Sequence, residues 1–225
     1  MTERFAIVIP ALNAEPSVGA VVRGCIEQLP DVIVVNDGST DRTAAAAANA
    51  GAIVVNHAMR RGKGGAMRTG FAWALERGFD GVIGVDADGQ HLPSEIPKLL
   101  RCREESGADL VIGGRSHLFA QMLPRRRLAN RFSTWAIAKL SWTPITDSQC
   151  GFRLYASRLL RGVTLRAEGF DMDSEVIVRA GLAGFKVAMT PIDLGFVDGI
   201  STSHYRAVSD TLRIAATVLR VRIGG

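Results

Sequence analysis

Two aspartates separated by one residue, Asp86 and Asp88, are the side chains in this sequence best suited to metal chemistry. They follow a short apolar run, residues 82–85, that is typical of a strand buried on both faces of a parallel sheet. Residues two apart in an extended segment project to the same side, so both carboxylates can bind one Mg²⁺ or Mn²⁺ ion, which would keep sites for phosphate oxygens. The stretch predicts a metal and phosphate site at the carboxyl end of a strand, where open α/β sheets bind ligands.

A second Asp-x-Asp pair, Asp171 and Asp173, shows that the spacing alone is weak support. This pair precedes an apolar helical pattern, so we interpret it as part of a helix start. We interpret Glu175 in the same way, as a first-turn carboxylate that complements the helix dipole.

The elements that must position these side chains alternate along the chain. Short apolar runs predict strands at residues 5–9, 32–35, 52–55, 82–85, 109–113 and, after a turn at 147–152, at 152–155. Helical patterns separate the first five, including one from about Pro93 to Ser106. This alternation predicts a single α/β domain, with a mostly parallel twisted sheet flanked by helices and built from right-handed crossovers.

Polar side chains follow three of these strands, and all should lie on one edge of the sheet. They are Asn13 with Glu15, Asn36 with Asp37, and Asp86 with Asp88. A nucleotide fits this arrangement if Asp37 accepts a hydrogen bond from the base or ribose and the Asp86 pair holds metal and pyrophosphate. For residues 37–40 alone, a plain turn before a helix capped by Ser39, Thr40 or Asp41 fits the sequence equally well.

The glycine-rich basic segment RRGKGG, residues 60–65, resembles a phosphate loop but lacks the required G-x-x-x-x-G-K-[ST] spacing. As a helix start it could hold phosphate through backbone N–H groups and Lys63, and a flexible exposed turn is the alternative. The dinucleotide fingerprint is absent after the first strand, because residues 11–19 contain a single glycine. This argues against a nicotinamide-dependent dehydrogenase.

The net charge of +5 is unevenly distributed. No acidic residue lies between Asp109 and Asp147, and six basic residues fall there: Arg115, Arg125, Arg126, Arg127, Arg131 and Lys139. Basic surfaces bind nucleic acid, anionic lipid or phosphorylated ligands. Aromatic residues make up 6% of the chain and no nucleic-acid-binding motif is present, so we expect no nucleic acid partner.

Composition places the 225-residue chain, 47% hydrophobic and 22% charged, among ordinary globular domains. No apolar run approaches the 18 residues of a membrane-spanning helix, and the first apolar run is too short for a signal peptide, so we expect a cytoplasmic protein. Three widely spaced cysteines, Cys25, Cys102 and Cys150, fit reduced thiols.

Several short motifs occur in an order that is specific even where each motif alone is not. They are PALNAE at 10–15, NDGSTDRT at 36–43, GKGGA at 62–66, DADGQH at 86–91, GGR at 113–115, DSQCGFRLY at 147–155 and DGISTSHYR at 198–206. Over nearly the whole chain this set resembles the family 2 glycosyltransferases of the GT-A fold, specifically the dolichol- or polyprenyl-phosphate sugar synthases.

The resemblance implies metal-dependent transfer of one sugar, with inversion, from a nucleotide-sugar such as GDP-mannose or a UDP-sugar to a polyprenyl or dolichyl phosphate. By position, it assigns the nucleotide-sugar to Pro10, Asn13, Asp37, Lys63, Asp86 and Gln90. It assigns Mg²⁺ or Mn²⁺ to Asp86 and Asp88, the acceptor phosphate to Arg115, Arg126, Arg127 and Asn130, and catalysis to Asp88, Arg115 and Arg126. It also implies a loop over the donor that carries Ser201, His204 and Arg206.

The chain departs from the family pattern in three places. Glu15 is displaced by one residue from its usual position, the usual second-strand aspartate pair is Asn36-Asp37, and Val197 and Asp198 stand where a basic residue often precedes Gly-x-Ser. Glu15 is therefore a doubtful nucleotide contact, and His204 and Arg206 would supply the missing charge. Cys150 occupies a position usually held by a small residue, and we interpret it as a packing residue.

Arginine chemistry agrees with the acceptor assignment, because guanidinium groups bind phosphate in a bidentate manner. A solvated basic face is the alternative interpretation of residues 125–127. A phosphate acceptor would need no general base, whereas an alcohol acceptor would need one, for which Asp147 and Glu175 are the candidates. A sugar-nucleotide pyrophosphorylase is disfavoured, because residues 11–15 lack its glycine-rich basic signature, and a catalytically silent nucleotide-sugar-binding subunit remains a further alternative.

We expect residues 1–115 to form a nucleotide-sugar-binding half, 116–205 an acceptor half and 206–225 a C-terminal amphipathic helix. In that helix Arg206, Arg213 and Arg220 would share one face, beside an apolar stripe of Leu212, Ala215, Ala216, Leu219 and Ile223. Such a helix can lie at an anionic membrane surface, or it can pack on the sheet with its arginines in water. The first possibility predicts a peripheral protein at the cytoplasmic face of the membrane, and a membrane-protein partner is the other possible anchor.

Overall fold

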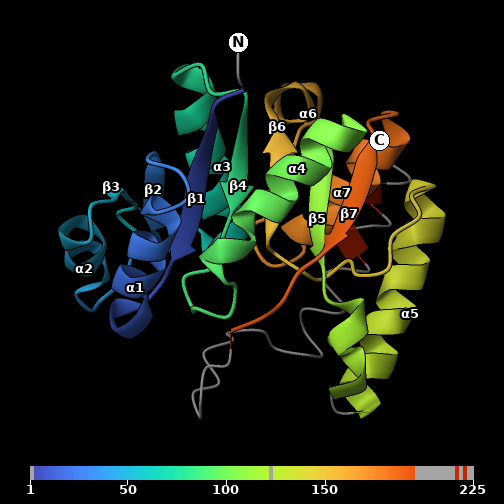
Figure 1. Ribbon diagram of the computed structural model, residues 1–225, viewed down its shortest axis with the longest axis horizontal. Coiled ribbons are helices and arrows are strands. Elements are labelled where there is room, and N and C mark those ends of the chain that lie inside the picture. Colours follow the sequence, from blue (N-terminus) through green and yellow to red (C-terminus); the bar gives the residue numbers. More distant parts are fainter. Residues whose placement is uncertain (1–2, 122–123, 196–215, 218–219, 222–225) are drawn as a thin grey trace.

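A seven-stranded sheet forms the middle layer of the described part of the protein, and helices cover both of its faces (Figure 1). The computed structural model describes residues 3–121, 124–195, 216–217 and 220–221. The strands are β1 (Phe5–Ala11), β2 (Val32–Asn36), β3 (Ile53–Asn56), β4 (Gly81–Gly84), β5 (Leu110–Gly114), β6 (Arg153–Ala156) and β7 (Val187–Pro191). The α-helices are α1 (Glu15–Ile26), α2 (Thr43–Asn49), α3 (Gly62–Glu76), α4 (Ile96–Ser106), α5 (Pro124–Ser141), α6 (Ser157–Gly162) and α7 (Met172–Leu182). Short 3₁₀ helices cover Pro93–Glu95 and Ser116–Gln121.

The sheet has the strand order β3-β2-β1-β4-β6-β5-β7, and every neighbouring pair is parallel except the two that involve β6. Because β6 is antiparallel to both β4 and β5, those two strands run in the same direction. The carboxyl ends of β1, β2, β4 and β5 therefore share one edge of the sheet, which we call the carboxyl rim. This confirms the single α/β domain with a mostly parallel sheet.

All six predicted strands are present, with ends displaced by at most two residues. The sixth strand lies inside the sheet, between β4 and β5. The seventh strand, β7, was not predicted, because its half-buried residues give a weak apolar signal. The predicted 93–106 helix is confirmed, with its first turn in 3₁₀ form.

The central strands consist of apolar runs because both of their faces are covered by helices. Ile7, Val8 and Ile9 of β1 are completely buried, as are Ile33 and Val34 of β2. The edge strand β3 differs, since Ile53 leaves 44% of its surface exposed.

Pro10 is tolerated in β1 because a backbone N–H at this position would point toward β4, which no longer pairs with β1 there. Residues two apart in a strand point the same way, and Val8 faces β4. The pairing of β1 with β4 ends at Val8 and Gly84, so no ladder hydrogen bond is lost at Pro10.

At the C-terminus, residues 216–217 and 220–221 are helical. The predicted loop residues Ser201, His204 and Arg206, and most of the predicted amphipathic helix, lie outside the described residues. None of the helices in the described part of the chain combines the length and the hydropathy needed to cross a bilayer.

Candidate active site

The carboxyl rim brings together the segments that the sequence predicted to meet there. Asn13 follows β1, Asp37 follows β2, and Asp86 and Asp88 follow β4. Arg115 follows β5 directly and joins the same rim. The expected shared location of these polar groups is confirmed, whereas their individual ligand contacts stay predictions.

Asp86 is held by a cation that comes from a different element. Lys63, near the start of α3, places its Nζ atom 2.8 Å from Asp86 Oδ1 and 3.2 Å from Oδ2 of Asp173 in α7. Burial opposes the charge on Lys63, but Asp173 and Asp86 outweigh it and raise the pKa of Lys63 above its ordinary value. Burial likewise opposes ionisation of Asp86, yet Lys63 lowers the pKa of Asp86 to about 2. Asp86 is therefore a carboxylate at neutral pH.

The ion pair between Lys63 and Asp173 corrects our interpretation of Asp173 as helix-start chemistry alone. Asp173 does lie in the first turn of α7, and Asp171 Oδ1 accepts a hydrogen bond from the Gly169 amide there. The Asp173 carboxylate, however, points to the rim and pairs with Lys63. Its Oδ1 is buried and has no hydrogen-bond partner among the described residues.

Asp88 is in a different electrostatic state from Asp86. Its Oδ1 accepts a 2.9 Å hydrogen bond from the Gln90 amide, and the side chain is half-buried. Burial and the nearby negative charge of Asp86 raise the pKa of Asp88. A divalent cation would relieve this repulsion, and hard carboxylate oxygens are ligands that Mg²⁺ and Mn²⁺ prefer.

The two carboxylates fit a metal only if the substrate completes its coordination. In the described part of the chain, no three His, Cys, Asp or Glu side chains are grouped so as to hold a metal ion by themselves. A site with two protein carboxylates and substrate phosphates is the usual arrangement for Mg²⁺.

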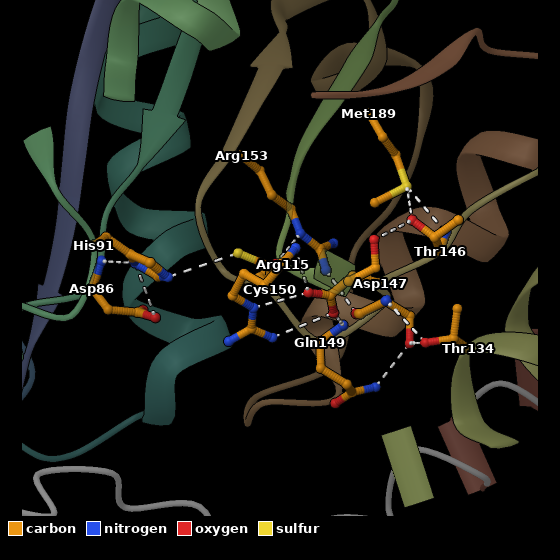
Figure 2. A network of polar contacts seen from close by, with 12 residues as sticks. Asp86, His91, Arg115, Thr134, Thr146, Asp147, Gln149, Cys150, Arg153 and Met189 are labelled. Carbon is orange, nitrogen blue, oxygen red and sulfur yellow. Dashed lines mark hydrogen bonds and ion pairs between the residues drawn. The ribbon is translucent and has the colours of Figure 1, made fainter. Parts of the chain in front are cut away.

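His91 packs under the Asp86 strand end as a neutral ring. Its Nδ1 atom accepts a 3.4 Å hydrogen bond from the Asp86 amide, and its Nε2 atom lies 3.8 Å from the Cys150 sulfur (Figure 2). Burial lowers the pKa of His91 to about 4, and Arg115 and Lys63 act in the same direction. His91 is therefore uncharged at neutral pH, and its ring lies between Asp86 and the residue 147–150 loop.

Arg115 is fixed by a buried carboxylate. Its Nε atom lies 2.9 Å from Asp147 Oδ2, and its Nη2 atom lies 3.3 Å from Asp147 Oδ1. Asp147 is completely buried. Burial opposes ionisation of Asp147, but Arg115 outweighs it and lowers the pKa of Asp147. The pair orients a permanent positive charge at the carboxyl rim.

The residue 147–150 loop contacts residues on both sides of the carboxyl rim (Figure 2). The Ser148 amide donates to the Thr134 hydroxyl of α5, the hydroxyl oxygens of these two residues lie 3.1 Å apart, and Cys150 contacts His91. The fully buried Arg153 donates to the carbonyl oxygens of Cys150, Ser148 and Asp173. The packing role predicted for Cys150 agrees with its burial.

Sequence reasoning missed Arg153. A charged residue within the apolar sixth strand was the available signal, since a fully buried arginine must satisfy its donors from neighbouring backbone.

Asp37 is buried and bound by its own chain. Its Oδ1 accepts hydrogen bonds from the Arg61 amide and from His57 Nδ1, and its Oδ2 accepts from the Gly62 amide, each at 2.8 Å. His57, another residue that the sequence reasoning missed, directly follows β3 and so reaches the same rim. Its Nε2 atom contacts the Thr69 hydroxyl at 2.9 Å. The contact of Asp37 with a base or ribose stays a prediction.

Three backbone amides at the glycine-rich start of α3 donate to partners within the protein, while phosphate binding by this segment stays one of the two possibilities that the sequence left open. The Arg61 and Gly62 amides donate to Asp37, and the Gly64 amide donates to the Glu168 carbonyl. A Cβ atom on Gly64 would lie 2.2 Å from the Ala167 carbonyl oxygen. The glycines thus allow α3 to approach residues 167–168 closely, and that approach places Lys63 between its two carboxylates.

Asn13 and Glu15 organise the loop after β2. Asn13 Oδ1 accepts a hydrogen bond from the Thr40 amide. The Glu15 carboxylate accepts hydrogen bonds from the backbone amide and the side chain of Arg42. The predicted cap of α2 by Ser39, Thr40 or Asp41 is wrong, because Arg42 is the N-cap residue and no side chain caps the helix. Asp41 Oδ1 instead accepts a hydrogen bond from the Thr43 amide. Glu15 is therefore a structural residue in this protein, which agrees with the doubt about its nucleotide contact.

The remaining predicted acceptor residues lie on α5. Arg126 and Arg127 fall in its first turn, and the half-buried Asn130 follows one turn later. Thr134, further along the same helix, binds α5 to the residue 147–150 loop, which also holds Arg115. Their contact with an acceptor phosphate stays a prediction.

Glu175 has a structural role. One of its oxygens accepts hydrogen bonds from the Arg166 and Ala167 amides, and the other pairs with Arg179 at 2.8 Å. The side chain is almost completely buried. Both candidate bases, Glu175 and Asp147, are thus committed to internal partners.

Comparisons with known proteins agree with this arrangement. The family model described as "Glycosyl transferase family 2" matches residues 6–163. The chain is 30% identical over 212 residues to the undecaprenyl-phosphate mannosyltransferase of Micrococcus luteus, in a match that covers 84% of this chain and 82% of the relative. It is 32% identical over 209 residues to the polyprenol monophosphomannose synthase of Mycolicibacterium smegmatis, in a match that covers 85% of this chain and 77% of the relative.

Solved structures share the fold. Glucosyl-3-phosphoglycerate synthase from Mycobacterium tuberculosis, in complex with Mn²⁺, uridine diphosphate and phosphoglyceric acid, superimposes with a TM-score of 0.74 at 20% identity, over 98% of this chain and 79% of that one. This likeness supports the GT-A assignment. With the family match over residues 6–163, it follows that the chain belongs to glycosyl transferase family 2 and is a glycosyltransferase.

Proposed function

We propose that this protein transfers one sugar, with inversion, from a nucleotide-sugar to a polyprenyl phosphate at the cytoplasmic face of a membrane. The names of the Micrococcus and Mycolicibacterium relatives support the acceptor class, because both act on polyprenyl phosphates. The donor is GDP-mannose or a UDP-sugar.

On the donor side, Asp86 and Asp88 hold a Mg²⁺ or Mn²⁺ ion together with the diphosphate. Such a cation offsets the negative charge that builds on the leaving nucleoside diphosphate. Lys63, whose Nζ atom lies 2.8 Å from Asp86, keeps that carboxylate ionised and in place. Asn13 and Asp37, which follow the neighbouring strands β1 and β2, contact the nucleoside.

On the acceptor side, Arg115, Arg126, Arg127 and Asn130 bind the phosphate. A phosphomonoester has a second pKa of about 6, so it is already an anionic nucleophile at neutral pH. Positioning then replaces general base catalysis, and the Asp147 carboxylate fixes the Arg115 guanidinium for this purpose.

The observation that carries this proposal is the commitment of both candidate bases to internal partners. Asp147 is bound to Arg115, and Glu175 is bound to Arg179 and two backbone amides. An alcohol acceptor would need a base to remove its proton, whereas a phosphate acceptor does not. Transfer to a non-lipid phosphate is the second candidate function, because the same arginines would bind it.

A donor and metal panel tests the donor side. Purified protein is incubated with GDP-mannose, UDP-glucose or UDP-N-acetylglucosamine, with Mg²⁺, Mn²⁺ or EDTA, and with a short polyprenyl phosphate. We expect one donor to be consumed at the rate of lipid product formation, and EDTA to stop the reaction. Donor binding without consumption in every combination would favour a catalytically silent subunit.

A further inference from the structure

The ring of His57, directly after β3, is held at both of its nitrogen atoms. Its Nδ1 atom lies 2.8 Å from Asp37 Oδ1, and its Nε2 atom lies 2.9 Å from the hydroxyl oxygen of Thr69 in α3. The side chains of His57 and Asp37 leave only 5% and 4% of their surface exposed. Because both ring nitrogens are occupied inside the protein, any effect of His57 on a ligand must pass through Asp37.

His57 is the donor in its contact with Asp37. A carboxylate oxygen only accepts hydrogen bonds, so the Nδ1 atom of the ring carries a proton. A hydrogen bond to a carboxylate is roughly twice as strong as one between neutral groups. The contact with Thr69 fixes the other end of the ring, so His57 restricts the rotation of the Asp37 carboxylate.

The hydrogen bonds of Asp37 leave one acceptor position open. A carboxylate has about four lone-pair positions, two on each oxygen. His57 and the Arg61 amide occupy both positions on Oδ1, and the Gly62 amide occupies one on Oδ2. Within the part of the chain that the structure describes, no other donor hydrogen-bonds to the Asp37 side chain. The remaining position on Oδ2 is the one that can accept a hydrogen bond from a ligand.

The backbone around His57 brings the ends of β2 and β3 close together. The His57 amide donates to the Asn36 carbonyl at 2.9 Å, and Asn36 Nδ2 donates to Asn56 Oδ1 at 2.8 Å. Gly38 has a φ of 73°, and a Cβ atom there would lie 2.8 Å from the Arg60 amide nitrogen. Glycine alone permits this approach. The end of β3 thus forms a fixed support for the residues that follow β2.

We propose that His57 is a positioning residue for the nucleotide, because it holds Asp37 with the open position on Oδ2 directed to the nucleoside of the donor. This inference rests on the proposed function in one respect, since the contact between Asp37 and the nucleoside comes from there. It assigns part of the affinity for the nucleoside to a side chain that touches no substrate. Without the His57 hydrogen bond, the nucleotide would have to order the Asp37 carboxylate on binding, and this weakens binding.

Two substitutions separate the hydrogen bond of His57 from the bulk of its ring. The amide nitrogen of asparagine lies the same number of bonds from Cα as the Nδ1 atom of histidine, and that of glutamine corresponds to Nε2. His57→Asn therefore keeps a donor for Asp37, whereas His57→Gln keeps only the contact with Thr69. His117→Gln, which changes an exposed histidine that contacts Asp193, is the matched control.

Calorimetric titration of the full chain compares two probes in the presence of Mn²⁺. UDP and GDP are titrated to find the nucleotide that binds more tightly, and inorganic pyrophosphate reports the affinity for the diphosphate part alone. We expect His57→Gln to bind the preferred nucleotide about tenfold more weakly than the wild-type protein, as for loss of a hydrogen bond to a charged group. His57→Asn and His117→Gln should bind it as the wild-type protein does. All three variants should bind pyrophosphate normally, which also shows that their sites are folded.

The variant Asp37→Asn tests whether His57 acts through Asp37. It removes the acceptor at Oδ2 and should weaken nucleotide binding by at least about tenfold. Combining it with His57→Gln should cause no further loss, because the second substitution then has nothing left to position.

Three results would overturn the inference. His57→Gln could bind the nucleotide as tightly as the wild-type protein. It could lose affinity for the nucleotide and for pyrophosphate equally, which would mean that His57 supports the whole rim. His57→Asn could lose as much affinity as His57→Gln, which would mean that the ring acts through its bulk.

The positioning role and the proposed activity fail separately. Nucleotide affinity that depends on His57 as described, without any transfer to polyprenyl phosphate, would refute the activity and support the positioning role. Transfer to polyprenyl phosphate by His57→Gln with an unchanged donor KM would support the activity and refute the positioning role.

Discussion

The Nζ atom of Lys63 lies 2.8 Å from Oδ1 of Asp86, so the first of the two predicted metal-binding carboxylates is already paired with a cation of the protein. The same ammonium group lies 3.2 Å from Asp173 on the far side. Two carboxylates thus share the Lys63 ammonium group, and the Nε atom of Arg153 lies 4.0 Å from the other oxygen of Asp173. Asp88 adds a further negative charge beside Asp86, and burial together with this repulsion raises the pKa of Asp88.

The Lys63 pairing predicts a large effect on stability. Lys63→Met should lower the free energy of unfolding by about 3 kcal/mol, because it removes the buried ammonium group that pairs with Asp86 and Asp173. Urea denaturation measures this change. Lys186→Met, which removes an exposed lysine, is the matched control and should change stability by less than about 0.5 kcal/mol. Equal stability of both variants would mean that the pair contributes nothing to the fold.

Asp88 should matter for sugar transfer and not for the stability of the fold. Asp88→Ala should reduce transfer at least about a hundredfold, because a metal ligand contributes several kcal/mol to transition-state charge stabilisation. It should not lower the melting temperature, since it removes a half-buried carboxyl that is repelled by Asp86. Glu104→Ala, on the exposed face of α4, is the control. Near-normal transfer by Asp88→Ala, still inhibited by EDTA, would remove Asp88 from the metal site.

Arg126 should act on the acceptor alone. Arg126→Ala should raise the KM for polyprenyl phosphate by about tenfold, as expected for loss of a charged hydrogen bond, and leave the donor KM unchanged. Steady-state kinetics with each substrate varied in turn separates the two effects, and Arg101→Ala on α4 serves as the control. A raised donor KM with an unchanged acceptor KM would place Arg126 on the other side of the reaction.

The buried thiols should be unreactive. Burial raises the pKa of Cys25 to about 12 and that of Cys150 to about 11. A raised pKa keeps the thiol protonated as the pH increases, so the nucleophilic thiolate stays scarce well above pH 8. Titration with a chromogenic disulfide at pH 8 should therefore leave both cysteines unmodified until denaturant is added. Rapid modification of more than one cysteine in the native protein would contradict the burial of Cys25 or Cys150.

Much of the rim was predictable because its cause is local. A strand buried on both faces must be apolar, so the run before Asp86 identified β4, and the next polar residues had to leave the sheet at its carboxyl end. The same reasoning located Asn13 and Asp37. The insertion of β6 between β4 and β5 was not predictable from periodicity, because strand order depends on long-range pairing.

Contacts between distant residues account for the other misses. Lys63 and Asp173 lie 110 positions apart, and no pattern near either one indicates the ion pair. The glycines at 62–65 permit either phosphate binding or close packing, and only the position of residues 167–168 decides between them. The apolar positions of α5 have helical spacing, which does not distinguish a buried face from an exposed one.

The most direct test of the proposed activity compares acceptors that differ in the group offered to the sugar. Polyprenyl phosphate, the corresponding polyprenol and phosphoglyceric acid are offered together with the preferred nucleotide-sugar, and the products are identified by mass spectrometry and their anomeric configuration by NMR. We predict a single product, in which the sugar is joined to the lipid through phosphate with inverted anomeric configuration. Transfer to the polyprenol hydroxyl, or to phosphoglyceric acid in preference to the lipid phosphate, would contradict the proposed activity.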